Sequence, residues 1–122
     1  MADKRQKLGK SGERIASAYL QKNGYIILSK NYRRKCGEID IIARQGDYLV
    51  FIEVKTRTTT SHGHPLEAVT QRKQKQISKV AQYYLAENNL FDTAARFDVV
   101  AVTILNNGRI QVELIPSAFD LC

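Results

Sequence analysis

Apolar residues follow two different spacings along this chain, and together they predict five strands and two helices. Short runs rich in β-branched and aromatic residues predict strands at residues 25–29, 38–43, 48–54, 96–105 and 110–115. A helical spacing marks residues 11–23 and a second segment from residue 66 or 69 to residue 87. The order αβββαββ predicts a single α/β domain over residues 11–119, with a central mixed β-sheet flanked by helices.

Local signals set the expected boundaries of these elements. Ser11 is a suitable N-cap for the first helix, which leaves residues 1–10 as a basic, flexible N-terminal arm and residues 120–122 as a short tail. Asn107-Gly108 predicts the turn of a final hairpin, and Pro116 is expected to end its second strand.

Gly46-Asp47 predicts a tight turn between residues 38–43 and 48–54, and this turn sets the pairing of the two strands. Counting outward from a Gln45–Tyr48 pair places Asp40 opposite Glu53, and Glu38 opposite Lys55. A three-residue loop would shift this register. Two carboxylates directly opposite each other destabilise a sheet. The pattern therefore favours a divalent cation between them, with Lys55 close by.

Glu13 has two interpretations. It is an acidic residue in the first turn of the predicted helix, where it would complement the helix dipole. It also lies at the edge of the apolar face formed by Ala16 and Leu20, from which it could reach the sheet face that carries Asp40.

Composition narrows the class of protein. The chain has 122 residues, 43% hydrophobic content and a formal net charge of +7, which favours a polyanionic partner such as nucleic acid. The sequence has no apolar run of transmembrane length, and its N-terminus is too charged for a secretory signal. We therefore expect a cytoplasmic protein with no membrane partner. Cys36 and Cys122, without metal-site spacing, are interpreted as reduced thiols.

Several cations lie near the predicted site in sequence. They are Arg33, Arg34 and Lys35 in an expected loop over residues 31–37, Arg57 after the site strand, and Arg72 and Lys75 on the second helix. They either contact phosphates or form solvated surface. His62 and His64, in the loop after Lys55, are interpreted as exposed residues, with a catalytic or metal role as the alternative.

Asp40, Glu53 and Lys55 together make a minimal set for phosphodiester hydrolysis. A carboxylate-bound Mg²⁺ activates water and stabilises the leaving oxygen, and a nearby lysine orients the water or offsets phosphate charge. The sequence has none of the motifs GxSxG, GxxxxGK[ST], GxGxxG or HExxH.

These residues resemble a known family. Glu13, Gly37-Glu38-Ile39-Asp40 and Glu53-Val54-Lys55 resemble the PD-(D/E)xK, or restriction-endonuclease-like, nuclease superfamily, in the branch of the archaeal Holliday-junction resolvases. GEIDIIA, VFIEVKTR and RFDVVAV are similar to the YraN-like proteins, and the resemblance covers residues 9–119. Ile39 stands where the superfamily's proline would be; the resolvase branch also lacks that proline.

The resemblance implies a restriction-endonuclease-like fold and a set of roles. Asp40, Glu53 and the main-chain carbonyl of Val54 would bind Mg²⁺ or Mn²⁺, Lys55 would be the catalytic lysine, and Glu13 would be the acidic residue contributed by the helix. Gln71 or Gln74 would match a polar residue of the second helix.

Three functions follow from these observations. The first is a Mg²⁺-dependent endonuclease acting on DNA in preference to RNA, with branched or structured DNA as one substrate class. If it cuts junctions symmetrically, it acts as a homodimer. The second is a non-catalytic nucleic-acid-binding protein that keeps the nuclease fold. The third is a partner-binding scaffold.

Overall fold

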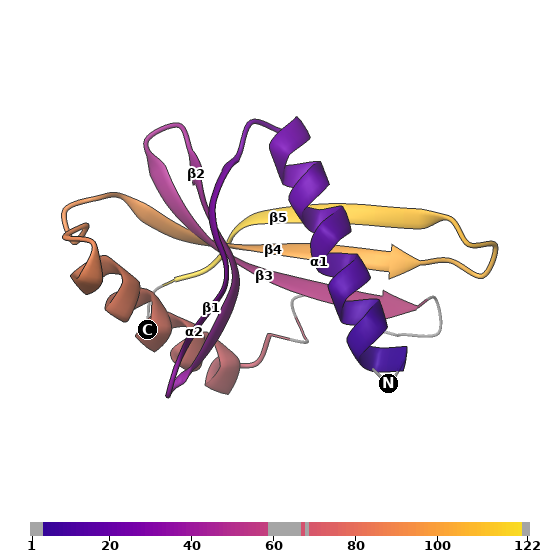
Figure 1. Ribbon diagram of the computed structural model, residues 1–122, viewed down its shortest axis with the longest axis horizontal. Coiled ribbons are helices and arrows are strands. Elements are labelled where there is room, and N and C mark those ends of the chain that lie inside the picture. The colour runs from indigo at the N-terminus through magenta and orange to yellow at the C-terminus, as the bar shows by residue number, and fades with distance from the viewer. Residues whose placement is uncertain (1–3, 59–66, 68, 121–122) are drawn as a thin grey trace.

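In the part of the chain that the structure describes, the fold has the predicted order of two helices and five strands (Figure 1). The computed structural model describes residues 4–58, 67 and 69–120. The elements are α1 (Lys4–Lys22), β1 (Ile26–Arg34), β2 (Gly37–Gln45), β3 (Tyr48–Thr58), α2 (Gln71–Glu87), β4 (Ala95–Ile104) and β5 (Ile110–Phe119). His62 and His64 lie outside the described residues, as does Cys122.

All five strands form one mixed sheet, in the order β1-β2-β3-β4-β5. β3 and β4 are parallel, and the other neighbouring strands are antiparallel. The parallel pair follows from the connection, because α2 carries the chain from the end of β3 back to the start of β4. The predicted α/β class and mixed sheet are confirmed.

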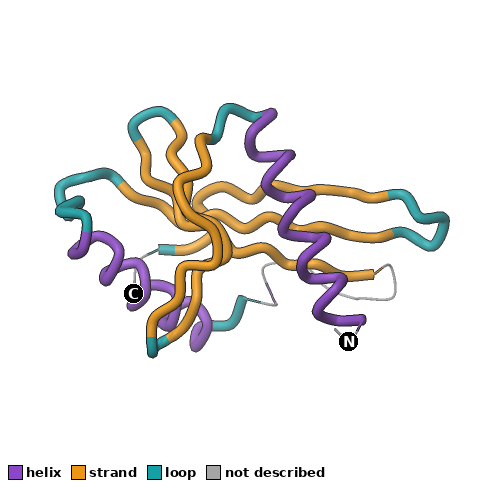
Figure 2. Tube along the Cα trace, viewed as in Figure 1, coloured by secondary structure: helices purple, strands orange, loops and turns teal. Residues whose placement is uncertain are grey.

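The two helices cover opposite faces of the sheet (Figure 2). Alternate residues of β3 point to the two faces. On one face, Ala16 and Leu20 of α1 share a buried cluster with Ile52. On the other, Ile77 of α2 shares a buried cluster with Phe51. β3 is thus buried on both sides, which fixes the positions of the residues that follow Ile52.

α1 begins at Lys4, so the predicted start after Ser11 is wrong. Lys, Arg, Gln and Leu, which fill residues 4–8, all favour helix, and no proline interrupts them. The helix ends near Gly24 as predicted, where a φ of +86° suits glycine.

Two strands are also longer than predicted. β1 continues through Arg34, so the expected loop over residues 31–37 is mostly strand, and only Lys35-Cys36 forms the turn to β2. β5 continues past Pro116 to Phe119, because β5 is an edge strand and a missing N–H is tolerated there. A shift in register between Phe97 and Val99 of β4, with a φ of +51° at Ser117, accommodates the extra length.

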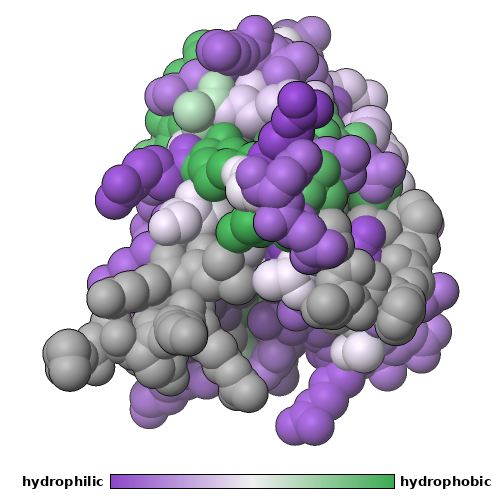
Figure 3. Space-filling model, turned by 90° about the vertical axis from the view of Figure 1, so that its right-hand side faces the viewer, coloured by the Kyte–Doolittle hydropathy of each residue, from purple (hydrophilic) through white to green (hydrophobic). Residues whose placement is uncertain are grey.

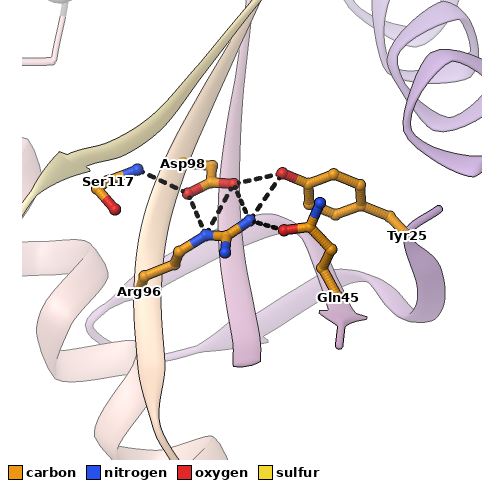
Figure 4. A network of polar contacts seen from close by, with 5 residues as sticks. All are labelled: Tyr25, Gln45, Arg96, Asp98 and Ser117. Atoms are coloured by element: carbon orange, nitrogen blue, oxygen red, sulfur yellow. Dashed lines mark hydrogen bonds and ion pairs between the residues drawn. The ribbon is translucent and has the colours of Figure 1, made fainter. Parts of the chain in front are cut away.

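A buried polar network fixes this irregular part of the β4–β5 pairing (Figure 4). Asp98 is fully buried and accepts hydrogen bonds from Tyr25 (2.8 Å), from Arg96 and from the backbone N–H of Ser117 (3.0 Å). Arg96 also donates to Gln45. The network joins Tyr25, just before β1, to the end of β2 and to both C-terminal strands, so it acts as a structural tie between them.

Among the described residues, neither helix combines the length and the apolar character needed to cross a membrane. Figure 3 shows the end of the molecule that carries the carboxyl ends of β3 and β4, where hydrophilic residues surround a smaller hydrophobic area.

Candidate metal and nucleic-acid site

The ladder between β2 and β3 ends next to the predicted acidic pair. Pairing runs from Gln45–Tyr48, as predicted from the turn, to Ile41–Ile52. At the next residue of β2, the Asp40 side chain forms the contact with β3: its Oδ2 accepts a hydrogen bond of 2.8 Å from the backbone N–H of Val54. A carboxylate thus binds a backbone group of the opposing strand, where the ordered ladder stops.

The structure brings the four predicted site residues together in one cleft. Glu13, Asp40, Glu53 and Lys55 line it, and Gly9, Val54 and Thr56 complete the lining; we call this group the acidic cleft. Its volume is about 380 Å³. Its lining residues come from the N-terminal half of α1, from β2 and from β3, and Figure 1 shows how these three elements are arranged. Three separate elements therefore contribute carboxylates or a lysine to one opening.

Glu13 reaches this cleft because α1 approaches β3 very closely at Gly12. A Cβ at Gly12 would collide with the Thr56 side chain, so only glycine permits this approach. Since α1 begins at Lys4, Glu13 does not lie in its first turn. The interpretation of Glu13 as a helix-dipole partner is therefore wrong, and its position matches the alternative, in which it faces the Asp40 region.

The carboxylates of the cleft all have raised pKa values, although Lys73 and Lys55 lie near Glu53. Burial, together with repulsion from the nearby Glu53, raises the pKa of Asp40 to about 7, in spite of the hydrogen bond from Val54. Burial also raises the pKa of Glu53, while Lys73 and Lys55 oppose this shift. Burial, followed by repulsion from Asp40 and Glu38, raises the pKa of Glu13. A positive ion placed here would be bound favourably.

Lys73 is the site residue that the sequence interpretation missed. Its Nζ lies 3.5 Å from Glu53 Oε1, and its side chain comes from the first turn of α2. The sequence does contain a signal for this, because Lys73 lies four residues before Ile77, at the start of the buried stripe of α2. A lysine at that position points toward the sheet.

Glu38 has a different partner from the predicted one. It forms an ion pair with Arg33, at 3.4 Å, in the β1–β2 hairpin. The ordered β2–β3 pairing stops before it reaches Glu38 and Lys55. Neither of the two predicted pairs beyond that point, Asp40 opposite Glu53 and Glu38 opposite Lys55, is thus part of the ordered pairing.

The predicted phosphate-contacting cations fall into two groups. Arg34 is exposed, but it is engaged by other side chains, because its Nε donates to Glu87 at 2.8 Å and its guanidinium lies 4.2 Å from the Tyr32 ring centroid. Arg57 is half-buried, and its Nε lies 3.5 Å from Thr103 Oγ1. The remaining four, Arg33, Lys35, Arg72 and Lys75, are exposed.

The carboxylate oxygens of the cleft suit a hard divalent cation that keeps part of its hydration shell. Among the described residues, no group of three or more His, Cys, Asp or Glu side chains is arranged to hold a metal ion. The acidic pair Asp40 and Glu53 supplies two carboxylates, and Mg²⁺ is usually bound through one or two carboxylates plus waters and substrate phosphates. The pair therefore fits Mg²⁺ or the similar Mn²⁺.

The fold and cleft define a small α/β protein with an acidic cleft where two strands of a mixed sheet separate, and with a lysine on the cleft wall. Residues 12–102 match the model of the uncharacterised protein family UPF0102. The chain belongs to this family, the YraN-like proteins, so the family resemblance expected from the sequence is confirmed.

The chain aligns with curated members of this family over most of the length of both sequences. The chain is 49% identical to a UPF0102 protein of Geobacter sulfurreducens over 114 residues, which is 93% of this chain and 89% of the relative. It is 52% identical to one of Geotalea daltonii, covering 93% and 90% of the two chains. It is 48% identical to one of Syntrophotalea carbinolica, covering 99% and 98%.

Proposed function

We propose that this protein is a metal-dependent endonuclease that hydrolyses phosphodiester bonds in DNA, with branched or structured DNA as its substrate class. The observation that carries the proposal is the acidic pair Asp40 and Glu53. These carboxylates lie in one cleft with Lys55, and the pKa of Asp40 is raised to about 7. A carboxyl in such a state is poised to exchange a proton for a cation.

The proposed roles follow from the positions of the residues. Asp40, Glu53 and the main-chain carbonyl of Val54 would hold Mg²⁺ or Mn²⁺, with Glu13 supporting the site from α1. The metal, when bound, supplies an activated water and stabilises the leaving oxygen. Lys55 is exposed at the wall of the cleft, where its ammonium can contact the substrate phosphate or orient the attacking water.

Exposed cations on two elements beside the cleft support a nucleic-acid substrate. Arg33 and Lys35 lie at the end of the β1–β2 hairpin, and Arg72 and Lys75 lie near the start of α2. Lys73, between the last two, reaches Glu53. The phosphates of a nucleic acid lying over these two elements would thus meet positive charge, in line with the net charge of +7.

A cleavage panel tests the proposal. Purified protein is incubated with duplex, single-stranded, flapped and four-way-junction DNA and with RNA, in Mg²⁺, Mn²⁺ or EDTA. We expect metal-dependent cleavage of at least one DNA form, strongest for a branched one. Salt-sensitive binding without cleavage of any form would instead favour the non-catalytic nucleic-acid-binding protein. Absence of both binding and cleavage would contradict both functions.

A further inference from the structure

Asn31 has an unusual backbone conformation directly beside the acidic cleft. Its φ is +54°, in the left-handed region that asparagine tolerates better than other residues with a side chain. Its neighbours on β1 form the pairs Lys30–Ile41 and Tyr32–Ile39 with β2. Asn31 therefore stands across from Asp40, within the part of the pairing that follows the register shift between Ile27 and Ser29.

The side chain of Asn31 links two of the nearby glutamates. In the orientation that satisfies its hydrogen bonds, the amide nitrogen donates to Glu38 Oε1 at 2.9 Å and to Glu13 Oε2 at 3.3 Å. An amide NH₂ has two hydrogens, so these two carboxylates use its full donor capacity. One side chain on β1 thereby connects β2 to α1 at the edge of the cleft.

We infer that Asn31 is a positioning residue, which holds the Glu13 carboxylate toward Asp40 and so completes the acidic cleft for a divalent cation. This inference rests on the proposed function. Glu13 is repelled by both Asp40 and Glu38, and a flexible glutamate under such repulsion would rotate toward solvent. The 3.3 Å hydrogen bond from Asn31 opposes that rotation, and its 2.9 Å hydrogen bond to Glu38 holds the amide in place.

The neutrality of the amide is central to this role. A lysine or arginine at residue 31 would hold Glu13 equally well, but its charge would cancel the negative potential that attracts the cation. Asparagine donates hydrogen bonds and adds no charge. It thus fixes the carboxylate and leaves the electrostatic attraction of the cleft intact.

A purely structural role fits these observations less well. Asn31 is exposed, and its positive φ is an unfavourable conformation for any residue other than glycine. The conformation therefore costs stability rather than contributing it. It does aim the amide at the two glutamates.

Asn31→Gly separates the two effects, because glycine adopts a positive φ freely but has no amide. The measurement is the rise in Tm over a series of Mg²⁺ concentrations, without nucleic acid. We expect Asn31→Gly to match or exceed the wild-type Tm in EDTA, and to need about tenfold more Mg²⁺ for the same rise. Asn89→Gly is the matched control, since Asn89 has the same φ of +54° next to the end of α2. It should leave the Mg²⁺ requirement unchanged.

A double variant tests whether Asn31 acts through Glu13. In a Glu13→Ala background, Asn31→Gly should have no further effect on the Mg²⁺ requirement. The inference would be overturned if Asn31→Gly needed no more Mg²⁺ than the wild type. It would also be overturned if Asn31→Gly raised the Mg²⁺ requirement equally in the wild-type and the Glu13→Ala backgrounds. Both results leave the proposed function standing. A wild-type protein that responds to neither Mg²⁺ nor Mn²⁺ would overturn the proposed function and this inference together.

Discussion

The ammonium group of Lys73 lies 3.5 Å from the Glu53 carboxylate, at the acidic cleft. Of the ion pairs that the described residues form, this is the one that involves the acidic pair. A lysine in this position both neutralises the pair and competes with an incoming cation. Its removal should therefore change metal binding in a defined direction.

Replacing Lys73 should make the cleft bind Mg²⁺ more tightly. In Lys73→Gln we expect affinity to rise a few-fold, because a partly exposed ion pair contributes about 0.2–1 kcal/mol. Isothermal titration or the Mg²⁺ dependence of Tm measures the change. Lys75→Gln is the control, since Lys75 is exposed on the same helix and no ion pair joins it to a described residue. Unchanged or weaker binding in Lys73→Gln would contradict the competition.

Metal binding should strengthen as the pH rises through 7. The pKa of Asp40 is about 7 in the folded protein, chiefly because the carboxyl is buried. A cation must displace the proton from this group, so affinity should fall by about tenfold for each pH unit well below 7 and level off above it. Titrations between pH 5.5 and 8.5 test this. A flat profile would mean that Asp40 is already ionised without metal.

The same proton affects stability when no metal is present. The pKa of Asp40 in the fold lies above its ordinary value of 3.8. The folded state therefore binds the proton more tightly than the unfolded state, and the resulting stability is present at low pH and lost as the pH rises through about 7. In EDTA at pH 8, Asp40→Asn should raise Tm by roughly 3–6 °C. It should also abolish the response to Mg²⁺. A lower Tm for the variant would contradict the charge repulsion in the cleft.

The sequence predicted the centre of the site because its information there is local. Gly46-Asp47 fixes the turn, the Gln45–Tyr48 register follows, and alternation then places Asp40 near Glu53. The Asp40–Val54 hydrogen bond could not be predicted, because it exists only where the ladder stops.

The errors have a related cause. Ser11 and Pro116 are local boundary signals, one for the start of a helix and one for the end of a strand, and in the fold both elements continue past them. α1 extends to Lys4 along a segment of good helix formers, and β5 passes Pro116 because an edge strand needs no hydrogen bond there. Asn31 was assigned to a loop, since no sequence pattern shows that a strand continues through a residue with positive φ.

The Asp98 network should support stability without affecting the site. Asp98→Ala would leave Arg96 without its closest carboxylate and should lower the free energy of unfolding by about 3–5 kcal/mol. Tyr25→Phe removes only the phenolic hydroxyl that donates to Asp98 and should cost about 1 kcal/mol. Urea unfolding measures both. The Mg²⁺ requirement of Tyr25→Phe should equal that of the wild type, and a change would link this network to the cleft.

Two neighbouring cations should behave differently toward nucleic acid. Lys35 is exposed in the turn between β1 and β2, whereas Arg34 is engaged by Glu87 and Tyr32. Lys35→Ala should weaken DNA binding and reduce the salt slope by about one, with little change in Tm. Arg34→Ala should lower Tm and change the salt slope less. Fluorescence anisotropy at several salt concentrations distinguishes the two, and equal slopes would place both side chains on the phosphates.

The central claim is that the acidic cleft hydrolyses phosphodiester bonds with the help of Lys55. It is tested most directly by single-turnover cleavage of the preferred DNA form in saturating Mg²⁺, with Lys55→Ala compared with wild type. Lys79→Ala, an exposed lysine of α2 outside the lining of the cleft, is the control. We predict a rate about 10²–10³-fold lower for Lys55→Ala, with DNA binding nearly unchanged and Lys79→Ala close to wild type. Cleavage by Lys55→Ala at the wild-type rate would contradict the account.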